Sequence, residues 1–342
     1  MRLRERGLTV GYLPTGPLNS ITDVPGIRVG QVTWVTEEPS VQRTGATVIM
    51  PPGDIYKEPL YAGTDVLNGF GELTGQATIT EWGLMASPVV LTGTRNLGVA
   101  YDAVMEHFFT RPEYRHGDEI PLPVVGECDD TYLNDGRRAI PQELILQAFQ
   151  KVSNGPVDEG GVGAGTGMHL FGYKGGIGTS SRKVKAQDGT VWTVGVLLNT
   201  NFGQPYQIRL PEGLKGLRAR DDRETPPPDG SCIGVVATDA PLWPHELKRL
   251  ARRIGLGLSR AGSVANDLSG EIFLAFSTAP KSAYQRLTEE RGLLTGQESS
   301  PITPLFDAVV EAAEESVWNA LLAGRTTTGA DSRLLEGFDP AL

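Results

Sequence analysis

The stretch Gly230-Ser-Cys-Ile-Gly-Val-Val-Ala-Thr238 places a hydroxyl residue at the head of a run of small and β-branched residues. Such a run predicts a buried strand that begins at Ser231. Residues 214–230 precede it and contain three consecutive prolines, a cluster of charged side chains and very few apolar ones. We therefore expect an exposed linker to end, and a buried strand to begin, at the Gly230–Ser231 peptide bond.

Outward from this point the chain alternates between two kinds of hydrophobic pattern. Runs rich in β-branched residues predict further strands at residues 27–35, 44–50, 88–92, 121–127, 191–199 and 272–277. Apolar residues at helical spacing predict helices at residues 74–82, 96–109, 141–152, 245–258 and 305–322. The loose alternation favours a layered α/β or α+β domain, with residues 54–64 and 113–119 as variable loops.

Composition excludes several classes of partner. The 342 residues carry a net charge of −10, which repels nucleic-acid phosphates and anionic membrane surfaces. No apolar run has the length of a signal-peptide core or a membrane span, and two cysteines make no disulfide framework. Four scattered histidines give no metal-ligand spacing. We expect a cytoplasmic protein that needs no metal and no cofactor.

Glycine is concentrated in the segment Gly160-Gly-Val-Gly-Ala-Gly-Thr-Gly-Met168. Backbone N–H groups in such turns can hold phosphates, but no window here fits the dinucleotide or P-loop pattern, and no strand leads into it. A run of turns or a backbone-lined pocket is the simpler interpretation. A cradle of N–H groups for an oxyanion or carboxylate is the alternative.

Cutting the Gly230–Ser231 bond would give Ser231 a new chemical capability. A free α-amino group has a pKa of about 7.7–8.0, so one residue could supply both nucleophile and base. The Ser231 hydroxyl could make the cut itself by attacking the Gly230 carbonyl, which gives an ester that water then hydrolyses. On these residues alone, a proline-rich turn that enters a strand remains the simpler interpretation.

Seven motifs, in order between about residue 16 and about residue 330, resemble the DmpA/BapA family of serine peptidases, which are L-aminopeptidase/D-esterase and β-aminopeptidase enzymes. The motifs are Asn19-Ser-Ile-Thr-Asp-Val-Pro-Gly-Ile-Arg-Val-Gly30, Glu127-Cys-Asp-Asp-Thr-Tyr-Leu-Asn-Asp135, Val162-Gly-Ala-Gly-Thr-Gly-Met168, Gly175-Gly-Ile-Gly-Thr-Ser-Ser181, Asn201-Phe-Gly203, Gly230-Ser-Cys-Ile-Gly-Val-Val-Ala-Thr-Asp-Ala-Pro-Leu242 and Ser269-Gly-Glu-Ile-Phe-Leu-Ala-Phe-Ser-Thr278.

The resemblance implies a four-layer αββα sandwich, shared with the ornithine acetyltransferases, as a single domain over residues 1–342. It implies self-cleavage at Gly230–Ser231 into a large chain, residues 1–230, and a small chain, residues 231–342. The linker would be residues 214–230. The resemblance also implies a homo-oligomer, commonly a tetramer of cleaved heterodimers.

The catalytic residues implied by the motifs are Ser231 as nucleophile, Asn201 as donor to the oxyanion, and Ser269 with Glu271 beside Ser231. Alternate strand residues share a face, so Ser269 and Glu271 can point the same way. Glu271 would then hold the Ser231 ammonium or tune the proton relay. Cys232 faces the other way and is expected to be a buried small side chain.

The resemblance assigns the substrate's free amino group to Glu127, because a carboxylate in a closed site needs a cation. Other residues implied to line the pocket are Tyr132, Asn134, Gly163 and Gly165. A structural role is expected for Arg95, Asn96, Asp129 and Asp130.

The implied activity is that of an aminopeptidase or amidase. It would remove a small L-, β- or D-residue from peptides, amides or esters through an acyl-enzyme on Ser231. One alternative is an acyl transferase of the ornithine acetyltransferase type, although the serine nucleophile and the Asp239-Ala-Pro-Leu242 continuation argue against it. The other is an uncleaved, non-catalytic homologue.

Overall fold

Two stacked β-sheets form the centre of the molecule, whose computed structural model describes residues 2–186, 189–211, 226–227, 230–284 and 302–338. The four-stranded sheet has the order β1 (Arg28–Thr36), β2 (Gln42–Met50), β5 (Val89–Gly93) and β6 (Val124–Cys128). The six-stranded sheet has the order β4 (Leu84–Met85), β3 (Leu60–Gly69), β12 (Ser269–Ser277), β11 (Gly230–Thr238), β10 (Val191–Asn201) and β9 (Gly176–Lys185).

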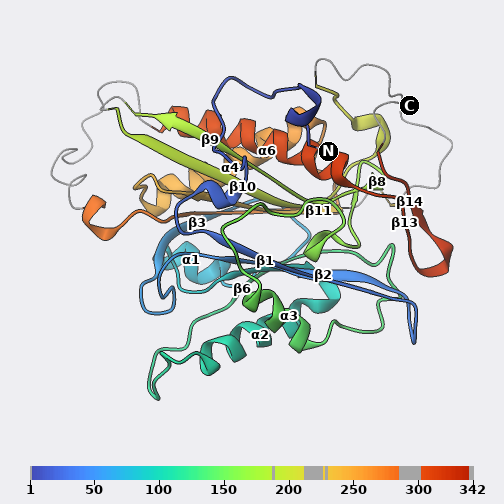
Figure 1. Ribbon diagram of the computed structural model, residues 1–342, viewed down its shortest axis with the longest axis horizontal. Helices are drawn as coiled ribbons and strands as arrows, with labels where there is room; N and C mark the ends of the chain where they lie inside the picture. The colour runs from blue at the N-terminus through green and yellow to red at the C-terminus, as the bar shows by residue number, and fades with distance from the viewer. Residues whose placement is uncertain (1, 187–188, 212–225, 228–229, 285–301, 339–342) are drawn as a thin grey trace.

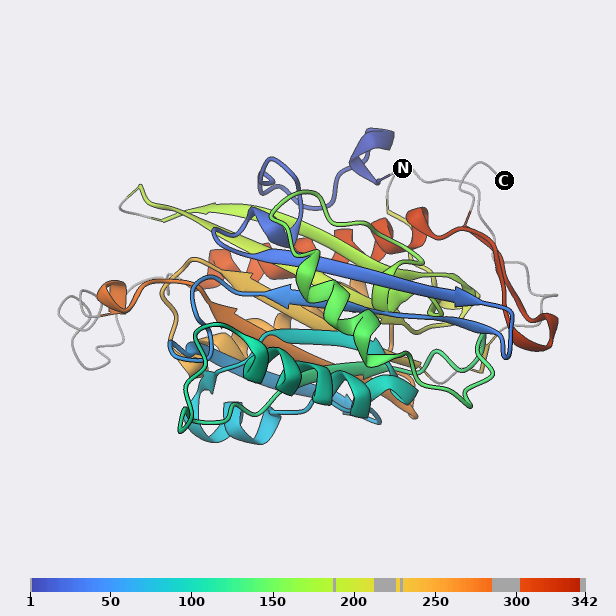
Figure 2. The same cartoon turned by 60° about the horizontal axis from the view of Figure 1, so that its bottom comes forward.

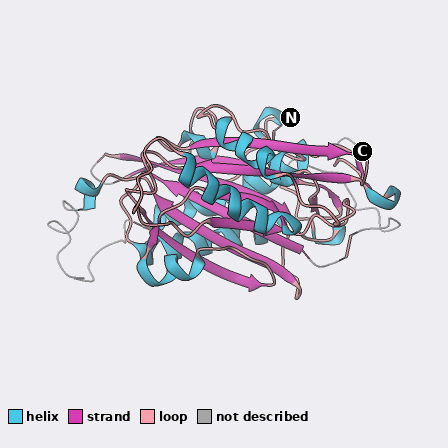
Figure 3. Ribbon diagram, turned by 90° about the horizontal axis from the view of Figure 1, so that it is seen from below, coloured by secondary structure: helices cyan, strands magenta, loops and turns pink. Residues whose placement is uncertain are grey.

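Helices cover the outer face of each sheet (Figure 1). Helices α2 (Leu97–Thr110) and α3 (Gln142–Gln150) lie across the four-stranded sheet, as the view from below shows (Figures 2 and 3). Helices α4 (Pro244–Ala261) and α6 (Thr303–Ala323) cover the six-stranded sheet, and the short α1 (Gln76–Trp82) packs beside β3 and β4. Two small hairpins complete the fold, β7 (His169–Leu170) with β8 (Tyr173–Lys174) and β13 (Thr327–Thr328) with β14 (Leu334–Leu335).

The hydrophobic core follows these four layers. One cluster of buried side chains fills the space between the two sheets, a second lies between the six-stranded sheet and α4 and α6, and a third lies under α2 and α3. Each sheet therefore buries both faces, which explains why its inner strands read as nearly continuous apolar runs. The predicted αββα sandwich is confirmed.

Helix α4 shows how the sequence sets these layers. Pro244 occupies its first turn, where the missing N–H costs nothing, and the Trp243 N–H donates to the Glu246 carboxylate at 2.9 Å. Its buried positions repeat every three or four residues: Leu247, Leu250, Ala251, Ile254, Leu258 and Ala261. Gly262 follows at φ +122°, a conformation that favours glycine, and ends the helix.

Three strands of the six-stranded sheet were not predicted: β3, β9 and the two-residue β4. Strand β3 includes residues 60–64, which we expected to be a loop. The sequence did not indicate a strand here because the outer half of β3 exposes the apolar Val66 and Leu67, so buried apolar and exposed polar residues do not alternate. Strand β9 carries glycine and buried polar residues. A Cβ at Gly178 would overlap the Ser316 carbonyl oxygen of α6, so glycine here is required by close packing. The predicted linker, residues 214–230, lies mostly outside the described residues.

Candidate active site

Ser231 is the second residue of β11, which lies between β10 and β12 in the six-stranded sheet. Ile233 and Val235 of this strand pack between the two sheets, whereas Cys232 and Val236 pack under helices α4 and α6. Side chains alternate along a strand, so the Ser231 hydroxyl points toward the four-stranded sheet and Cys232 away from it. The expectation that Cys232 is buried on the opposite face is confirmed.

A cavity of about 550 Å³ opens beside Ser231, where β3, β6 and β10 end and β11 begins. Ser231, Asn201 and Glu127 all line it, although they belong to three strands that are well separated along the chain. All three side chains are largely buried. The volume is in the range of sites for small molecules and short peptides.

The side-chain amide of Asn201 is oriented from both sides toward Ser231. Its Oδ1 accepts the His169 backbone N–H at 3.0 Å, and its Nδ2 donates to the Asp129 carbonyl oxygen at 2.8 Å. Asn201 and Ser231 pair across the antiparallel β10–β11 ladder, and Nδ2 lies 3.3 Å from the Ser231 Oγ. The second N–H of the amide therefore points to the place where charge would develop if Ser231 attacked a carbonyl.

Glycine is required at two positions beside Ser231, because other backbone segments approach closely there. A Cβ at Gly230 would lie 2.6 Å from the Asn201 carbonyl oxygen and 2.9 Å from the Phe202 Cα. Gly270 pairs with Ser231 on the parallel strand β12, and a Cβ there would overlap the Phe70 carbonyl oxygen. The two glycines therefore let β3, β10 and β12 close tightly around the Gly230–Ser231 peptide.

Glu127 is the penultimate residue of β6, on the opposite sheet, and the hydrogen bonds to its carboxylate come from neutral donors. Its carboxylate accepts the Glu72 backbone N–H at 2.8 Å and a short hydrogen bond from the Thr94 hydroxyl. Burial raises the pKa of Glu127, and these two hydrogen bonds only partly oppose that shift. The carboxylate is thus held in position, and a cation in the cavity would stabilise its charged form.

Ser269 and Glu271 lie on β12, where Ser269 is paired with Gly230 and Glu271 with Cys232. The Ser269 hydroxyl donates a short hydrogen bond to the Glu271 carboxylate, so the two side chains share a face as expected. That face is the one carrying Cys232, opposite the Ser231 hydroxyl. The structure therefore brings the pair beside the Gly230–Ser231 backbone rather than into the cavity with the hydroxyl.

The remaining residues implied to bind substrate do not all lie at the cavity. Tyr132 lines the cavity, but Asn134, Gly163 and Gly165 are not among the residues that line it. The Asn134 amide is occupied by backbone: it accepts the Arg43 N–H at 2.6 Å and donates to the carbonyl oxygens of Arg43 and Asp130 at 3.0 and 2.7 Å. We therefore leave these three residues out of the proposed substrate site.

The glycine-dense segment surrounds a cation. The buried Lys174 ammonium donates to the carbonyl oxygens of Gly165, Met168 and Gly175 at 2.8–2.9 Å. Carbonyl oxygens, not N–H groups, thus converge here, so the anion-cradle interpretation is wrong for this part of the segment. Gly163 and Gly165 pack too closely against β2 and β9 to accept a Cβ, which makes the segment a tight structural turn.

Several cavity residues were missed by sequence reasoning: Phe70, Gly71, Thr94, His169, Leu268 and Arg333. They come from strand ends and loops, and no spacing pattern links them. Asp129, expected to be structural, also lines the cavity, while Asn96 does hold the fold by bonding Thr44 and the Ile140 N–H at 2.8 Å each. Burial lowers the pKa of His169 to about 3, so its imidazole is neutral.

No three His, Cys, Asp or Glu side chains among the described residues are placed to hold a metal ion. None of the helices in this part of the chain is both long and apolar enough to cross a membrane.

Known proteins share this architecture along its whole length. The model of peptidase family S58 matches residues 19–335. β-Peptidyl aminopeptidase BapA of Sphingosinicella xenopeptidilytica is 39% identical over 98% of this chain and 88% of its own length. The structure of a Burkholderia sp. β-aminopeptidase matches with a TM-score of 0.85 and 37% identity, covering 100% of this chain and 96% of that one.

A second solved structure carries the same fold. The L-aminopeptidase D-Ala-esterase/amidase from Ochrobactrum anthropi, described as a variant of the Ntn hydrolase fold, matches with a TM-score of 0.81 and 33% identity. The match covers 99% of this chain and 96% of that one.

Proposed function

The chain belongs to peptidase family S58, and we propose that it is a serine aminopeptidase that releases its own nucleophile by cutting the Gly230–Ser231 bond. The observation that carries the proposal is the approach of Asn201 Nδ2 to Ser231 Oγ, at 3.3 Å, in a cavity that also holds the Glu127 carboxylate. Nucleophile, oxyanion donor and anchor for an amino group are thereby present in one site.

Self-cleavage would begin at the Ser231 hydroxyl. Oγ attacks the Gly230 carbonyl carbon, a C–O bond forms, the C–N bond breaks, and the hydroxyl proton ends on the Ser231 nitrogen. Water then hydrolyses the ester, leaving a Gly230 carboxylate, a free Ser231 hydroxyl and a new α-amino group. The absence of a side chain at Gly230, required by the packing around it, also leaves the carbonyl open to attack.

Substrate hydrolysis would reuse the same atoms. The substrate ammonium pairs with Glu127 and its first carbonyl lies over Ser231, whose α-amino group takes the hydroxyl proton as Oγ attacks. The free N–H of Asn201 stabilises the oxyanion, an interaction that is worth about 10²–10³ in rate in other hydrolases. The amine leaves with the proton, and water releases the first residue from Ser231.

Ser269 and Glu271 fit this scheme through the α-amino group. The Ser231 nitrogen lies in the plane of the sheet, and the pair lies on the neighbouring strand on the far side from the cavity. From there the pair would hold or tune the amino group without occupying the space of the substrate. They are positioning residues for the base in this proposal.

The relatives support a small first residue as the substrate preference. One is named a β-peptidyl aminopeptidase and another an L-aminopeptidase D-Ala-esterase/amidase. We propose that this chain removes a small L-, β- or D-residue from short peptides, amides or esters. We further propose a cytoplasmic homo-oligomer of cleaved pairs, for which the two free, buried cysteines are compatible with a reducing compartment.

Intact mass under denaturing conditions tests the proposal. The wild type should separate into residues 1–230 and 231–342, whereas Ser231→Ala should stay intact and inactive. The wild type should then hydrolyse amino-acid amides, and free amino acids added as acceptors should form no new product. A wild-type chain that stays whole, or transfer of the acyl group to the acceptors, would contradict the proposed function.

A further inference from the structure

Arg333 is the single lysine or arginine among the described residues that line the cavity. We propose that its guanidinium binds the free carboxylate of a short peptide whose ammonium is held by Glu127. The preferred substrates are then zwitterionic short peptides rather than amides, esters or long chains. This inference rests on the proposed function, because it assigns the two ends of the substrate of the same site.

The loop that carries Arg333 is held firmly against the cavity wall. The Gly329 N–H donates to the Arg333 carbonyl oxygen, and the Ala330 N–H donates to the Leu133 carbonyl oxygen, both at 2.9 Å. A Cβ at Gly329 would lie 2.6 Å from the Leu133 Cα, so the loop and the segment after β6 are in close contact. The position of Arg333 is thereby tied to that of Tyr132, the neighbour of Leu133.

Two residues before Arg333 adopt an uncommon backbone conformation. Asp331 and Ser332 have φ values of +53° and +58°, although neither is glycine. Consecutive left-handed residues of this kind cost free energy and persist where the surroundings enforce them, often beside ligand sites. Here the enforced turn directs the chain so that Arg333 reaches both the active-site cavity and a second cavity of about 430 Å³.

The Arg333 guanidinium has N–H groups that remain available to a ligand. It lies over the Tyr132 ring, 5.3 Å from the ring centroid, and one nitrogen donates to the Tyr132 carbonyl oxygen at 3.4 Å. Within the part of the chain that the structure describes, no carboxylate oxygen lies within 4.0 Å of it. An arginine held over an aromatic ring with free N–H groups is suited to paired hydrogen bonds with a carboxylate.

The other charges of the cavity limit the size of the effect. Glu127 and Asp129 are both carboxylates, so the interior favours a cation, while His169 is neutral. Asp331 and Glu336 line the adjoining cavity that Arg333 also reaches. A substrate carboxylate must therefore bind near the rim, at Arg333, while its ammonium lies deeper, at Glu127. Because the rim is exposed to solvent, we expect a moderate, salt-sensitive contribution to binding.

A matched pair of substrates tests this assignment. The same dipeptide is assayed as the free acid and as the C-terminal amide, with wild type, Arg333→Gln, Arg333→Lys and Arg325→Gln. Arg325 is a nearby exposed arginine that does not line the cavity. Arg333→Gln should lower kcat/KM for the free acid about 10-fold through KM, change the amide less than about 2-fold, and reduce the salt dependence for the acid.

The control results decide between the possible failures. Arg333→Lys should restore part of the acid preference because it keeps the charge, and Arg325→Gln should match wild type on both substrates. Equal losses on acid and amide, or none on either, would overturn the role of Arg333 while leaving the proposed function intact. A wild type that hydrolyses neither substrate would overturn both. Equal cleavage and equal Tm among the variants establish that all are folded.

Discussion

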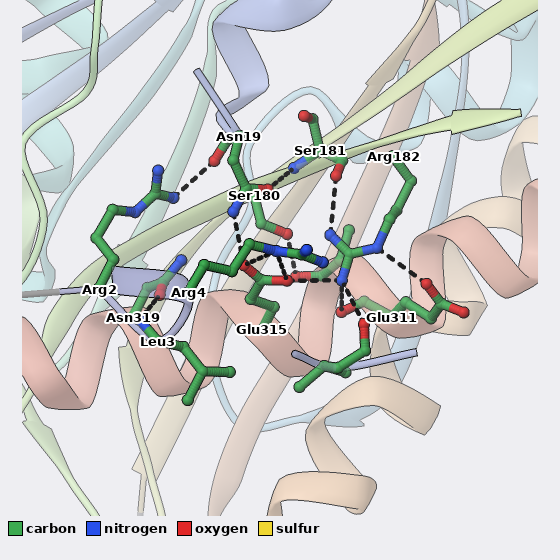
Figure 4. A network of polar contacts seen from close by, with 12 residues as sticks. Arg2, Leu3, Arg4, Asn19, Ser180, Ser181, Arg182, Glu311, Glu315 and Asn319 are labelled. Carbon is green, nitrogen blue, oxygen red and sulfur yellow. Dashed lines mark hydrogen bonds and ion pairs between the residues drawn. The ribbon is translucent and has the colours of Figure 1, made fainter. Parts of the chain in front are cut away.

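Arg182 and Glu127 are both buried charged side chains, but their surroundings differ in kind. The Arg182 guanidinium lies 2.9 Å from a Glu311 carboxylate oxygen and 2.7 Å from one of Glu315 (Figure 4). Glu315 also pairs with Arg4 at 2.9 Å. Charge is matched by opposite charge throughout this network, which joins the N-terminal segment and β9 to helix α6.

Glu127 has no such partner. Its carboxylate accepts hydrogen bonds from a backbone N–H and from a threonine hydroxyl, and no Lys, Arg or His nitrogen of the described residues lies within 4.0 Å of it. Burial therefore raises its pKa, since desolvation of the charged form outweighs these two hydrogen bonds. A cation brought into the cavity by a ligand would stabilise the charged form of this carboxylate.

The paired charges of the network hold the fold together, whereas the Glu127 carboxylate lines the cavity beside neutral hydrogen-bond donors. In the network, Arg4 and Arg182 precede the Gly230–Ser231 bond, whereas Glu311 and Glu315 follow it. If the chain is cut there, the network would keep the two products together. Four changes test this division, in order of decreasing expected effect.

Breaking the network should cost the most. Arg182→Met leaves the buried Glu311 carboxylate without its cation and the buried Glu315 carboxylate with Arg4 alone. We expect a loss of about 3–5 kcal/mol in the free energy of unfolding, measured with urea. The matched control is Arg137→Met, because Arg137 pairs with Asp135 at 2.8 Å but is 85% exposed. That exposed pair should be worth less than about 1 kcal/mol. Similar losses in the two variants would contradict the distinction.

Neutralising Glu127 should damage activity and not stability. Glu127→Gln removes the charge that would bind the substrate ammonium, and we expect kcat/KM to fall about 100-fold, mainly through KM, as for a charge-assisted hydrogen bond. Stability should stay the same or rise, because a desolvated charge is lost. Glu72→Gln, a nearby exposed change, is the control. A destabilised Glu127→Gln would place this residue with the structural charges.

Self-cleavage should depend on a neutral buried contact near the scissile bond. The Gln204 Nε2 donates to the carbonyl oxygens of Pro226 and Pro227 at 3.1 and 3.2 Å, just before Gly230. Gln204→Leu should slow the appearance of the two chains about 10-fold, since two hydrogen bonds that orient the substrate peptide are lost. Tyr206→Ala, an exposed change in the same turn, should cleave at the wild-type rate. Equal rates would remove Gln204 from the cleavage machinery.

The pH dependence of substrate binding should show the smallest effect. Protonation removes the negative charge of Glu127, so KM should rise as pH falls through its raised pKa, beginning above the ordinary value of 4.5. In Glu127→Gln this rise should be absent. A wild-type KM that stays constant down to pH 4.5 would show that the ammonium is held elsewhere.

Most helices and strands were predictable because their burial patterns are periodic. The strand predicted at 191–199 extends to Asn201, and the helix predicted at 305–322 spans Thr303–Ala323. Strand β9 was not predicted because it buries Ser180, Ser181 and Arg182, which are residue types that are normally exposed. Their polar groups are satisfied by α6 and by the N-terminal segment, partners that lie more than a hundred residues away.

In the candidate site, too, the sequence pointed to some residues and not to others. Motifs identified Ser231, Asn201 and Glu127, whose chemistry is local to each residue type. Motifs also suggested Asn134 as a pocket residue, and the structure instead uses its amide to fix the start of β2. No motif pointed to Arg333 or to the buried His169, because the tertiary fold around a cavity decides which side chains line it.

The sequence by itself determined most helices and strands, the position of the Gly230–Ser231 junction and the residue types that could do chemistry there, because periodicity and side-chain chemistry are local properties. The αββα layers were implied by the resemblance of its motifs to a known family. Only the tertiary structure decided which charges are paired and which are left in the cavity. That outcome depends on strand register and on the approach of segments far apart in the chain, such as β6 to β11 and residue 333 to residue 132. Burial and distance set the electrostatic energy of a carboxylate, and neither is written in its neighbours along the sequence.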